Sequence, residues 1–419
     1  MSNYPIPEKL IYQGVESFGT PLWLYDRGTI EERIRELQVF DAVRYAQKAN
    51  SNLSILSLMK KMGVVVDAVS AGEIYRALKA GYRGGATKKT PEIVYTADIF
   101  DADALALVKE HQIAVNIGSP DMIPQLAEAG IKTELTLRVN PGFGHGHSRK
   151  TNTGGDLSKH GVWFEQIKDC MKLAQANGMW ISGLHMHIGS GADFEHLSKV
   201  TEAMREAARH LGSHIRMIST GGGFPIPYRE SEEGNRIDIN AYYKLWDDTR
   251  KQIAQSVGHS VSLEVEPGRY LVAESGLLVS KIRAIKTMGE NKFYIVDAGF
   301  TDLVRPAFYG SYHKISILPQ GSSVLGEDSD VIVAGPLCES GDVFTQEEGG
   351  YVVSRKLPEA KVNDLLVLHD TGAYGAAMSS NYNSRRLAAE VLYSKGELHL
   401  IRKRQTFEQM TENDRIVGL

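Results

Sequence analysis

The stretch Val43-Arg44-Tyr45-Ala46-Gln47-Lys48 has the pattern of a short, largely apolar strand that ends in a single lysine. Seven further stretches of this kind follow it, and helical patterns such as that of residues 71–78 fill the intervals. The predicted strands span residues 43–48, 64–69, 93–96, 114–117, 134–139, 181–187, 215–219 and 262–266. Eight strand–helix units within roughly 240 residues predict a parallel (β/α)8 barrel of the TIM type.

The pattern changes after about residue 275, where short strands alternate with turns and long helical patterns end. The strands predicted there span residues 293–297, 331–334, 364–369 and 397–401. Such a run of short strands predicts a C-terminal β-sandwich or β-barrel-like domain. We therefore expect an α/β chain with a barrel over residues 27–273 and a β domain made of residues 1–26 and 274–419.

The composition limits the partners and the location of the protein. A chain of 419 residues that is 42% hydrophobic can bury the cores of two domains. The net charge of −4 arises without a basic run, which disfavours nucleic acid and membranes as partners. The start MSNYPIPEKL lacks an apolar signal region, and no stretch is long enough to span a membrane. Cys170 and Cys338 are too few for a disulfide framework, so we expect a cytoplasmic protein.

Polar residues and glycines gather at the carboxyl ends of the predicted strands, where barrel enzymes keep their active sites. They are Lys48 after the first strand, Asp67 and Ser70 after the second, His187 after the sixth, Gly221, Gly222 and Gly223 after the seventh, and Glu266 and Arg269 after the eighth. A lysine in such a place is costly to bury unless it does chemistry. Ser70 is expected to cap the next helix in a capping box with Glu73, whereas Asp67 either caps that helix or faces the site.

These residue types match the needs of one cofactor. A lysine amine can form a Schiff base with an aldehyde, and glycine N–H groups can hold a phosphate. A carboxylate can pair with a pyridinium nitrogen, and a histidine ring can stack on an aromatic face. Together they predict a site for pyridoxal 5′-phosphate, which stabilises carbanions as an electron sink.

Motifs along the whole chain carry a resemblance to a known family. They are YAQKANSN (45–52), HMHIGSG (185–191), GGG (221–223), EPGR (266–269), VDAGFTDLVRPAFYG (296–310), GPLCESGDV (335–343) and DTGAYGAAMSSNYNSR (370–385). With them the chain resembles the diaminopimelate decarboxylases, which share the alanine racemase-like fold (fold type III of pyridoxal phosphate enzymes) with ornithine and arginine decarboxylases. The resemblance implies decarboxylation of meso-2,6-diaminopimelate to L-lysine and carbon dioxide, the last step of bacterial lysine synthesis. It also implies a head-to-tail homodimer with active sites at the interface.

The resemblance further implies a role for each matching residue. The catalytic residues would be Lys48, His187, Glu266 and Cys338, with Cys338 supplied by the partner subunit as proton donor to the carbanion. The cofactor would be bound by Lys48, His187, Ser190, Gly221, Gly222, Gly223, Glu266 and Tyr374. The substrate would be bound by Arg269, Arg305, Tyr309, Glu339 and Tyr374.

Arg305 and Glu339 are the main reason in the residues themselves to expect diaminopimelate. The planar guanidinium binds a carboxylate with two hydrogen bonds, and an acid takes the amine, so the two match an amino-acid head group at the far end of the substrate. The alternative is a decarboxylase of ornithine, lysine or arginine on the same fold. The chain departs from the family pattern at Gln47, at Phe224-Pro225 and at Arg386, where many relatives have proline.

Three other classes of protein fit part of the sequence. The H-x-H pairs at residues 145–147 and 185–187 are of the kind that barrel metal hydrolases use, but a metal leaves EPGR and CESGD unexplained, and we expect no metal. A non-catalytic pyridoxal-binding homologue typically lacks Lys48 or Cys338. A racemase of the same fold weakens the partner of the pyridine nitrogen, which here is the acidic Glu266.

Overall fold

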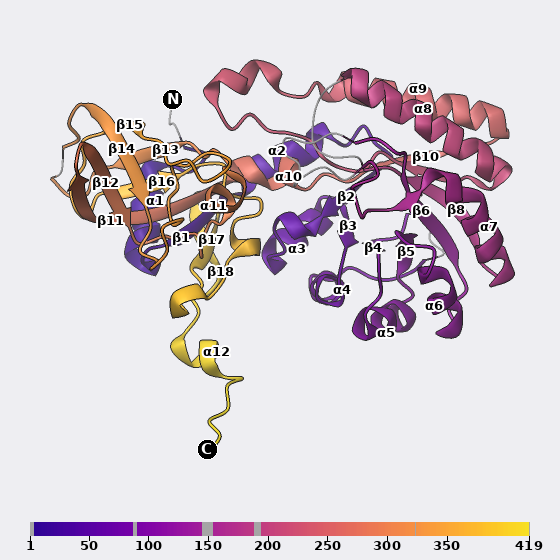
Figure 1. The fold of residues 1–419 in the computed structure, drawn as a ribbon, viewed down its shortest axis with the longest axis horizontal. Helices are drawn as coiled ribbons and strands as arrows, with labels where there is room; N and C mark the ends of the chain where they lie inside the picture. Colours follow the sequence, from indigo (N-terminus) through magenta and orange to yellow (C-terminus); the bar gives the residue numbers. More distant parts are fainter. Residues whose placement is uncertain (1–3, 87–89, 145–153, 188–193, 323, 419) are drawn as a thin grey trace. The chain divides into compact units, whose positions relative to one another are not determined.

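The computed structural model describes residues 4–86, 90–144, 154–187, 194–322 and 324–418, which form two compact units (Figure 1). The barrel unit contains Glu32–Ile226 and Asn235–Leu271, and the β unit contains Met1–Glu31, Pro227–Gly234 and Val272–Leu419. The domain boundaries expected from the sequence stay a prediction. The structure adds that the short segment Pro227–Gly234 groups with the β unit.

In the described part of the barrel unit, eight parallel strands pair in a closed ring. In order around it they are β2 (Ala42–Ala46), β3 (Val65–Ala68), β4 (Ile93–Ala97), β5 (Ala114–Ile117), β6 (Glu134–Asn140), β8 (Trp180–His185), β9 (Met217–Ser219) and β10 (Ser262–Val265), which pairs with β2 again. The two-residue strand β7 (Val162–Trp163) pairs with β6 at its end. The predicted parallel barrel is confirmed, and each ring strand overlaps the range predicted for it.

Helices connect these strands and start at defined residues. They are α2 (Arg27–Glu36), α3 (Leu53–Lys61), α4 (Ala71–Lys79), α5 (Ala102–His111), α6 (Met122–Glu128), α7 (Ile167–Ala176), α8 (Phe194–Leu211), α9 (Ile239–Val257) and α10 (Arg269–Val272). Side chains of Asn52, Ser70, Asp101 and Asp238 cap the starts of α3, α4, α5 and α9 by accepting backbone N–H groups. These caps fix where each strand-to-helix loop ends, and so hold the residues at the carboxyl ends of the strands.

The ring closes between the first and the last strand. Arg44 on β2 donates to Glu264 Oε2 on β10 through Nε at 3.0 Å and Nη2 at 2.8 Å, and both side chains are buried. At the carboxyl ends of the same strands, the N–H of Ala46 donates to the carbonyl of Pro267 at 3.1 Å. The second contact places the residues after β2 beside those after β10.

The β unit is a mixed sheet. In its described residues the strand order is β15-β14-β12-β11-β1-β17-β18, with β16 paired to β11 and β13. The strands are β1 (Leu22–Asp26), β11 (Gly276–Met288), β12 (Asn291–Val296), β13 (Ile315–Leu318), β14 (Asp328–Ala334), β15 (Arg355–Pro358), β16 (Leu365–Leu368), β17 (Ala389–Ser394) and β18 (Glu397–Arg402). The expected separate β domain is confirmed. β1 lies between β11 and β17, so the N-terminal segment belongs to the middle of this sheet.

Three helices complete the β unit within the described residues: α1 (Glu8–Phe18), α11 (Arg305–Tyr309) and α12 (Phe407–Thr411). Helix α1 buries Leu10, Ile11 and Val15 in the apolar core that β1, β11 and β17 share. Burial of this apolar face stabilises the sheet from one side. Across the described residues of both units, no helix is both long and apolar enough to cross a membrane.

Candidate active site

Lys48 lies just beyond β2, in the one-turn 3-10 helix η1 (Gln47–Ala49). The sequence predicted that the strand reaches Lys48, but it ends at Ala46. Gln47 is buried and its Nε2 donates to the carbonyl of Asp67 at 3.0 Å, which holds the turn against β3. Lys48 itself is exposed, so the turn buries its neighbour and leaves the amine open to a ligand at the carboxyl ends of the strands.

Asp67, on β3, faces the site. Its buried carboxyl has a pKa raised to about 6, first by burial and then by the negative charge of Glu266. Oδ1 has no hydrogen-bond partner among the described residues. Asp67 does not cap the next helix, because Ser70 Oγ accepts the N–H of Glu73 at 3.2 Å instead. Glu73 Oε2 accepts from the N–H of Val69 rather than Ser70, so the capping box is only partly formed.

Glu266 follows β10 and is held by side chains from two other strands. Ser219 Oγ donates to Oε1 at 2.8 Å, and His185 Nε2 lies 3.1 Å from Oε2. His185 Nδ1 lies 2.7 Å from Asn116 Nδ2, so both ring nitrogens face a buried polar partner. Burial raises the pKa of Glu266, but His185 and Ser219 outweigh it and hold the pKa below its usual value. Glu266 is therefore a buried, ionised carboxylate at neutral pH.

His187 packs against the glycine run that follows β9. The N–H of Gly222 donates to His187 Nδ1 at 2.7 Å, which fixes the plane of the ring. Burial and then the positive charges of Arg138 and Lys48 hold the pKa of His187 well below its usual value. The ring of His187 is therefore neutral at pH 7.

Close packing explains two of the three glycines. A Cβ on Gly222 would lie 2.2 Å from the carbonyl oxygen of Glu266. Gly221 has a φ of +68°, and a Cβ there would lie 2.6 Å from the carbonyl oxygen of Met186. The N–H of Gly221 donates to Ser219 Oγ at 3.2 Å. The amides of Gly221 and Gly222 thus have partners in the barrel unit, and the phosphate contact of the three glycines stays a prediction.

Arg138, on β6, joins the charged centre of the barrel and was not predicted. Burial lowers the pKa of its guanidinium, and the charges of Asp98, Glu266 and Asp67 oppose that shift. A positive group thus stands near three carboxylates in the barrel unit. Arg138 lies in a strand that also contains Glu134, Thr136 and Asn140, so no sequence signal singled it out.

In the β unit, Arg305 is held by neutral groups. It begins α11 and is only 5% exposed. Nη1 donates to Tyr228 Oη at 2.8 Å and lies 3.1 Å from His313 Nε2, and Nη2 lies 3.3 Å from Ser311 Oγ. His313 Nδ1 lies 2.8 Å from the carbonyl of His369, to which only a protonated Nδ1 can donate. In a neutral ring Nε2 then accepts from Arg305, so these contacts orient the guanidinium.

Cys338 sits exposed on a loop that Asp342 shapes. Asp342 is buried, and its two oxygens accept the N–H groups of Leu337 at 2.8 Å and Phe300 at 2.7 Å. The N–H of Cys338 donates to Asn383 Oδ1 at 2.8 Å. The backbone under the thiol is therefore fixed while the thiol points to solvent. Asp342, the last residue of the CESGD motif, thus holds the loop in place, a role that was not predicted.

Four other predicted site residues have the following places in the fold. Glu339 is exposed beside the thiol, and Tyr309 ends α11 half-buried. Tyr374 has a φ of +57°, a left-handed conformation that is uncommon for a large side chain and is typical of functional sites. Arg269 begins α10 in the barrel unit. Roles for these residues stay predictions.

Some predictions fall on residues outside those described. Ser190, predicted at the phosphate, lies outside them, as do His145 and His147. Within the described ranges, no group of three or more histidine, cysteine or acidic side chains could hold a metal ion. His185, the other candidate ligand, directs its nitrogens at Asn116 and Glu266.

Comparison with known proteins decides the family. A family model described as "Pyridoxal-dependent decarboxylase, pyridoxal binding domain" matches residues 27–273. The chain belongs to the pyridoxal-dependent decarboxylases. Its similarity to individual members extends far beyond the matched domain.

Curated and solved members of this decarboxylase family align along nearly the whole chain. Diaminopimelate decarboxylase of Escherichia coli (strain K12) is 53% identical over 395 residues, which cover 94% of this chain and 93% of that protein. A crystal structure of a diaminopimelate decarboxylase matches with a TM-score of 0.93 and 51% identity, covering 98% of this chain and 97% of the other. A diaminopimelate decarboxylase from M. jannaschii in complex with L-lysine matches with a TM-score of 0.85 and 29% identity, covering 97% and 94%.

The barrel unit has the donors that the family's cofactor, pyridoxal 5′-phosphate, requires. The exposed amine of Lys48, the neutral ring of His187 and the ionised Glu266 lie at the carboxyl ends of strands. Asp67 Oδ1 is a buried acceptor with no hydrogen-bond partner among the described residues, which a bound group can satisfy. The residues therefore fit the cofactor. The roles of Lys48, His187 and Glu266 stay predictions, and Asn116, Arg138 and His185, which interact with them directly or through one another, were not predicted.

A first prediction concerns the charge of Glu266. Glu266→Gln keeps an acceptor for Ser219 and removes the negative charge next to His185. We expect kcat to fall by about 10²- to 10³-fold, the range seen when one fixed electrostatic contact is lost. The affinity for the cofactor, followed by fluorescence quenching, should change much less. Glu165→Gln, at an exposed position, is the control, and an unchanged kcat in Glu266→Gln would remove Glu266 from this role.

Proposed function

We propose that this pyridoxal-dependent decarboxylase converts meso-2,6-diaminopimelate to L-lysine and carbon dioxide. The similarity to diaminopimelate decarboxylases along almost the whole chain carries the proposal. The structure supports it, because the barrel presents a lysine amine and a buried, ionised carboxylate at the carboxyl ends of its strands. When bound, pyridoxal 5′-phosphate draws electrons from the carbon that loses carbon dioxide.

The proposed division of roles within the barrel follows from its contacts. Lys48 binds the cofactor covalently, and the fixed ring of His187 stacks on the pyridine. Glu266, held ionised by His185 and Ser219, keeps the proton on the pyridine nitrogen. This retained proton favours full electron withdrawal and decarboxylation over the weaker withdrawal that a racemase uses. Gly223 and Ser190 contribute to the phosphate site.

The β unit supplies the groups that select the substrate. We assign the distal carboxylate of the substrate to Arg305, whose guanidinium is oriented by Tyr228, Ser311 and His313. Arg269, Tyr309 and Tyr374 assist at the substrate, and Glu339 takes the distal ammonium. The exposed thiol of Cys338 delivers a proton to the carbon that has lost carbon dioxide, in the active site of the partner subunit of a homodimer. The two free cysteines suit a cytoplasmic location.

One assay tests the function. Carbon dioxide release is measured from the holoenzyme with meso-diaminopimelate, lysine, ornithine and arginine at equal concentration. We expect release from diaminopimelate to exceed release from the other three by orders of magnitude, because they lack the distal carboxylate. Preference for ornithine, lysine or arginine would refute the substrate assignment. Inversion of configuration at the reacting carbon without release of carbon dioxide would show racemisation instead.

A further inference from the structure

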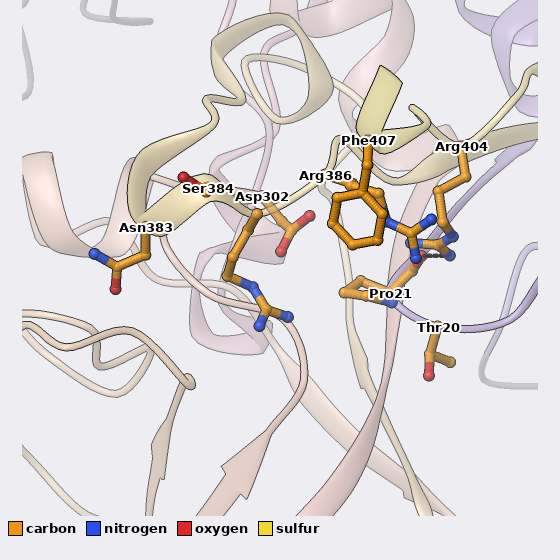
Figure 2. Close-up of a pocket in the computed structure, with 9 residues that line it drawn as sticks. Thr20, Pro21, Asp302, Asn383, Ser384, Arg386, Arg404 and Phe407 are labelled. Atoms are coloured by element: carbon orange, nitrogen blue, oxygen red, sulfur yellow. Dashed lines mark hydrogen bonds between the residues drawn. The ribbon is translucent and has the colours of Figure 1, made fainter. Parts of the chain in front are cut away.

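A cavity in the β unit is lined by three arginines (Figure 2). Its volume is about 350 Å³, within the range of about 300–1,000 Å³ typical of small-molecule sites. Arg385, Arg386 and Arg404 line it together with Asp302 and Phe407. None of these residues has a part in the decarboxylase site proposed above.

The three guanidinium groups carry charge that the protein does not neutralise directly. Arg385 Nη2 donates to the carbonyl of Asp297 at 2.6 Å, and Arg404 Nη2 donates to the carbonyl of Pro21 at 2.6 Å. Arg386 lies over the ring of Phe407 at 4.6 Å. Within the described residues, none of the three arginines forms an ion pair with a carboxylate. Their backbone and aromatic contacts orient the guanidinium groups and leave their charge in place.

The cavity wall has too few acidic side chains to balance the charge of the three arginines. Asp302 is buried, and its Oδ2 accepts the N–H of Gly299 at 3.1 Å. Burial raises the pKa of Asp302 to about 6 despite the nearby arginines. Burial and the positive charges of Arg386 and Arg385 in turn lower the pKa of Arg404, although the charges of Asp302 and Asp297 oppose that shift. The lining therefore has one carboxylate against three guanidinium groups, and an anion in the cavity would relieve their mutual repulsion.

We propose that this cavity binds a small molecule that bears a phosphate, with the phosphate on the three arginines and an apolar or planar body against Phe407. Guanidinium groups bind phosphate oxygens through paired, charge-assisted hydrogen bonds, which favours phosphate over a simple halide. Phe407 is 60% exposed and stands beside Arg386 at the cavity (Figure 2), so its ring is open to a ligand. The departure from the family pattern at Arg386 thereby gains a structural account.

The cavity also touches the loop that carries the thiol. Asn383 and Ser384 line it, and both have a φ of 53°, a left-handed conformation that tertiary contacts must maintain. Asn383 Oδ1 accepts the N–H of Cys338 at 2.8 Å. A ligand that holds Asn383 and Ser384 in this conformation also restrains the backbone of Cys338. Such a ligand therefore slows alkylation of the Cys338 thiol. Any effect on turnover rests on the proposed function, whereas binding and alkylation do not.

The test uses the holoenzyme, in which the cofactor already fills its own phosphate site. Calorimetric titration with inorganic phosphate and with AMP, at constant ionic strength, should show saturable binding. Arg386→Ala should weaken both by about 10- to 100-fold, the value of a hydrogen bond to a charged group. Arg415→Ala, which removes an exposed arginine outside the cavity, should leave both unchanged. Phe407→Ala should weaken AMP more than inorganic phosphate, and AMP should slow iodoacetamide modification of Cys338.

Three results would overturn the proposal. They are no saturable binding of either probe to the holoenzyme, equal affinity in Arg386→Ala, and equal weakening by the Arg415→Ala control. If the cavity instead receives a carboxylate of a second copy, the assembled enzyme binds neither probe and Arg386→Ala weakens self-association. An inactive decarboxylase that still binds phosphate through Arg386 would refute the proposed function and leave this inference standing.

Discussion

An equal mixture of two inactive variants, Lys48→Ala and Cys338→Ala, should recover about a quarter of the wild-type activity after reassociation. Each active site is expected to take Lys48 from one chain and Cys338 from its partner. A mixed dimer then has one site with both lesions and one with neither. Random pairing makes about half of the dimers mixed, and half of their sites are intact. Carbon dioxide release from diaminopimelate measures the recovery.

The controls for this experiment are the two variants reassociated separately. Each should stay inactive, because every site in such a dimer has the same lesion. If thiol and lysine came from the same chain, every site in the mixture would have one lesion and no activity would return. The exposed position of Cys338 on a fixed loop is the structural reason to expect an exchange between subunits.

Arg305→Leu should abolish the preference for diaminopimelate. Removing one partner of a buried charge pair typically costs about 2–5 kcal/mol, which corresponds to about 30- to 5,000-fold in kcat/KM. Any weak activity on lysine, which lacks a distal carboxylate, should not fall with it. Steady-state kinetics on both substrates provide the measurement.

Two variants separate recognition from folding in this prediction. Arg283→Leu removes an exposed arginine of β11 and should leave both activities unchanged. Arg305→Lys keeps the charge without the planar fork, so it should recover only part of the preference. A parallel loss of activity on both substrates in Arg305→Leu would assign Arg305 to folding or to the cofactor instead.

The barrel was predictable because most of its strands are short, largely apolar runs that are buried along most of their length. The residues at which the strands end were harder to predict, because hydrogen bonds between segments that are distant in the sequence determine where a strand ends. Gln47 binds the backbone of Asp67 and begins η1. Strand β2 therefore ends at Ala46, two residues before its predicted end at Lys48. Strand β1 was not predicted at all. Its partners, β11 and β17, lie more than 240 residues away, and no local pattern encodes that pairing.

The candidate active site likewise contains residues that the sequence predicts and residues that only the structure shows. Lys48, His187 and Glu266 stand in motifs, so a reading of the sequence finds them. Asn116 lies on β5 and His185 on β8. Asn116 contacts His185, and His185 contacts Glu266, only because the ring brings their strands together. The sequence left metal binding by the pair at residues 185–187 open only as a less favoured alternative, because a histidine that supports a carboxylate and one that binds zinc look alike in sequence.

The position of β1 in the middle of its sheet sets an order for synthesis of the chain. Residue Leu22 pairs with Ala389, which leaves the ribosome roughly 20–70 s later at ~5–20 residues per second. The barrel strands all emerge in that interval and can pair among themselves, while β1 waits for β17. A nascent chain interrupted between β11 and β17 carries β1 with one unpaired edge, which is a template for association with other chains. Early binding of a chaperone to the first 30 or so residues would therefore protect this protein more than binding anywhere in the barrel.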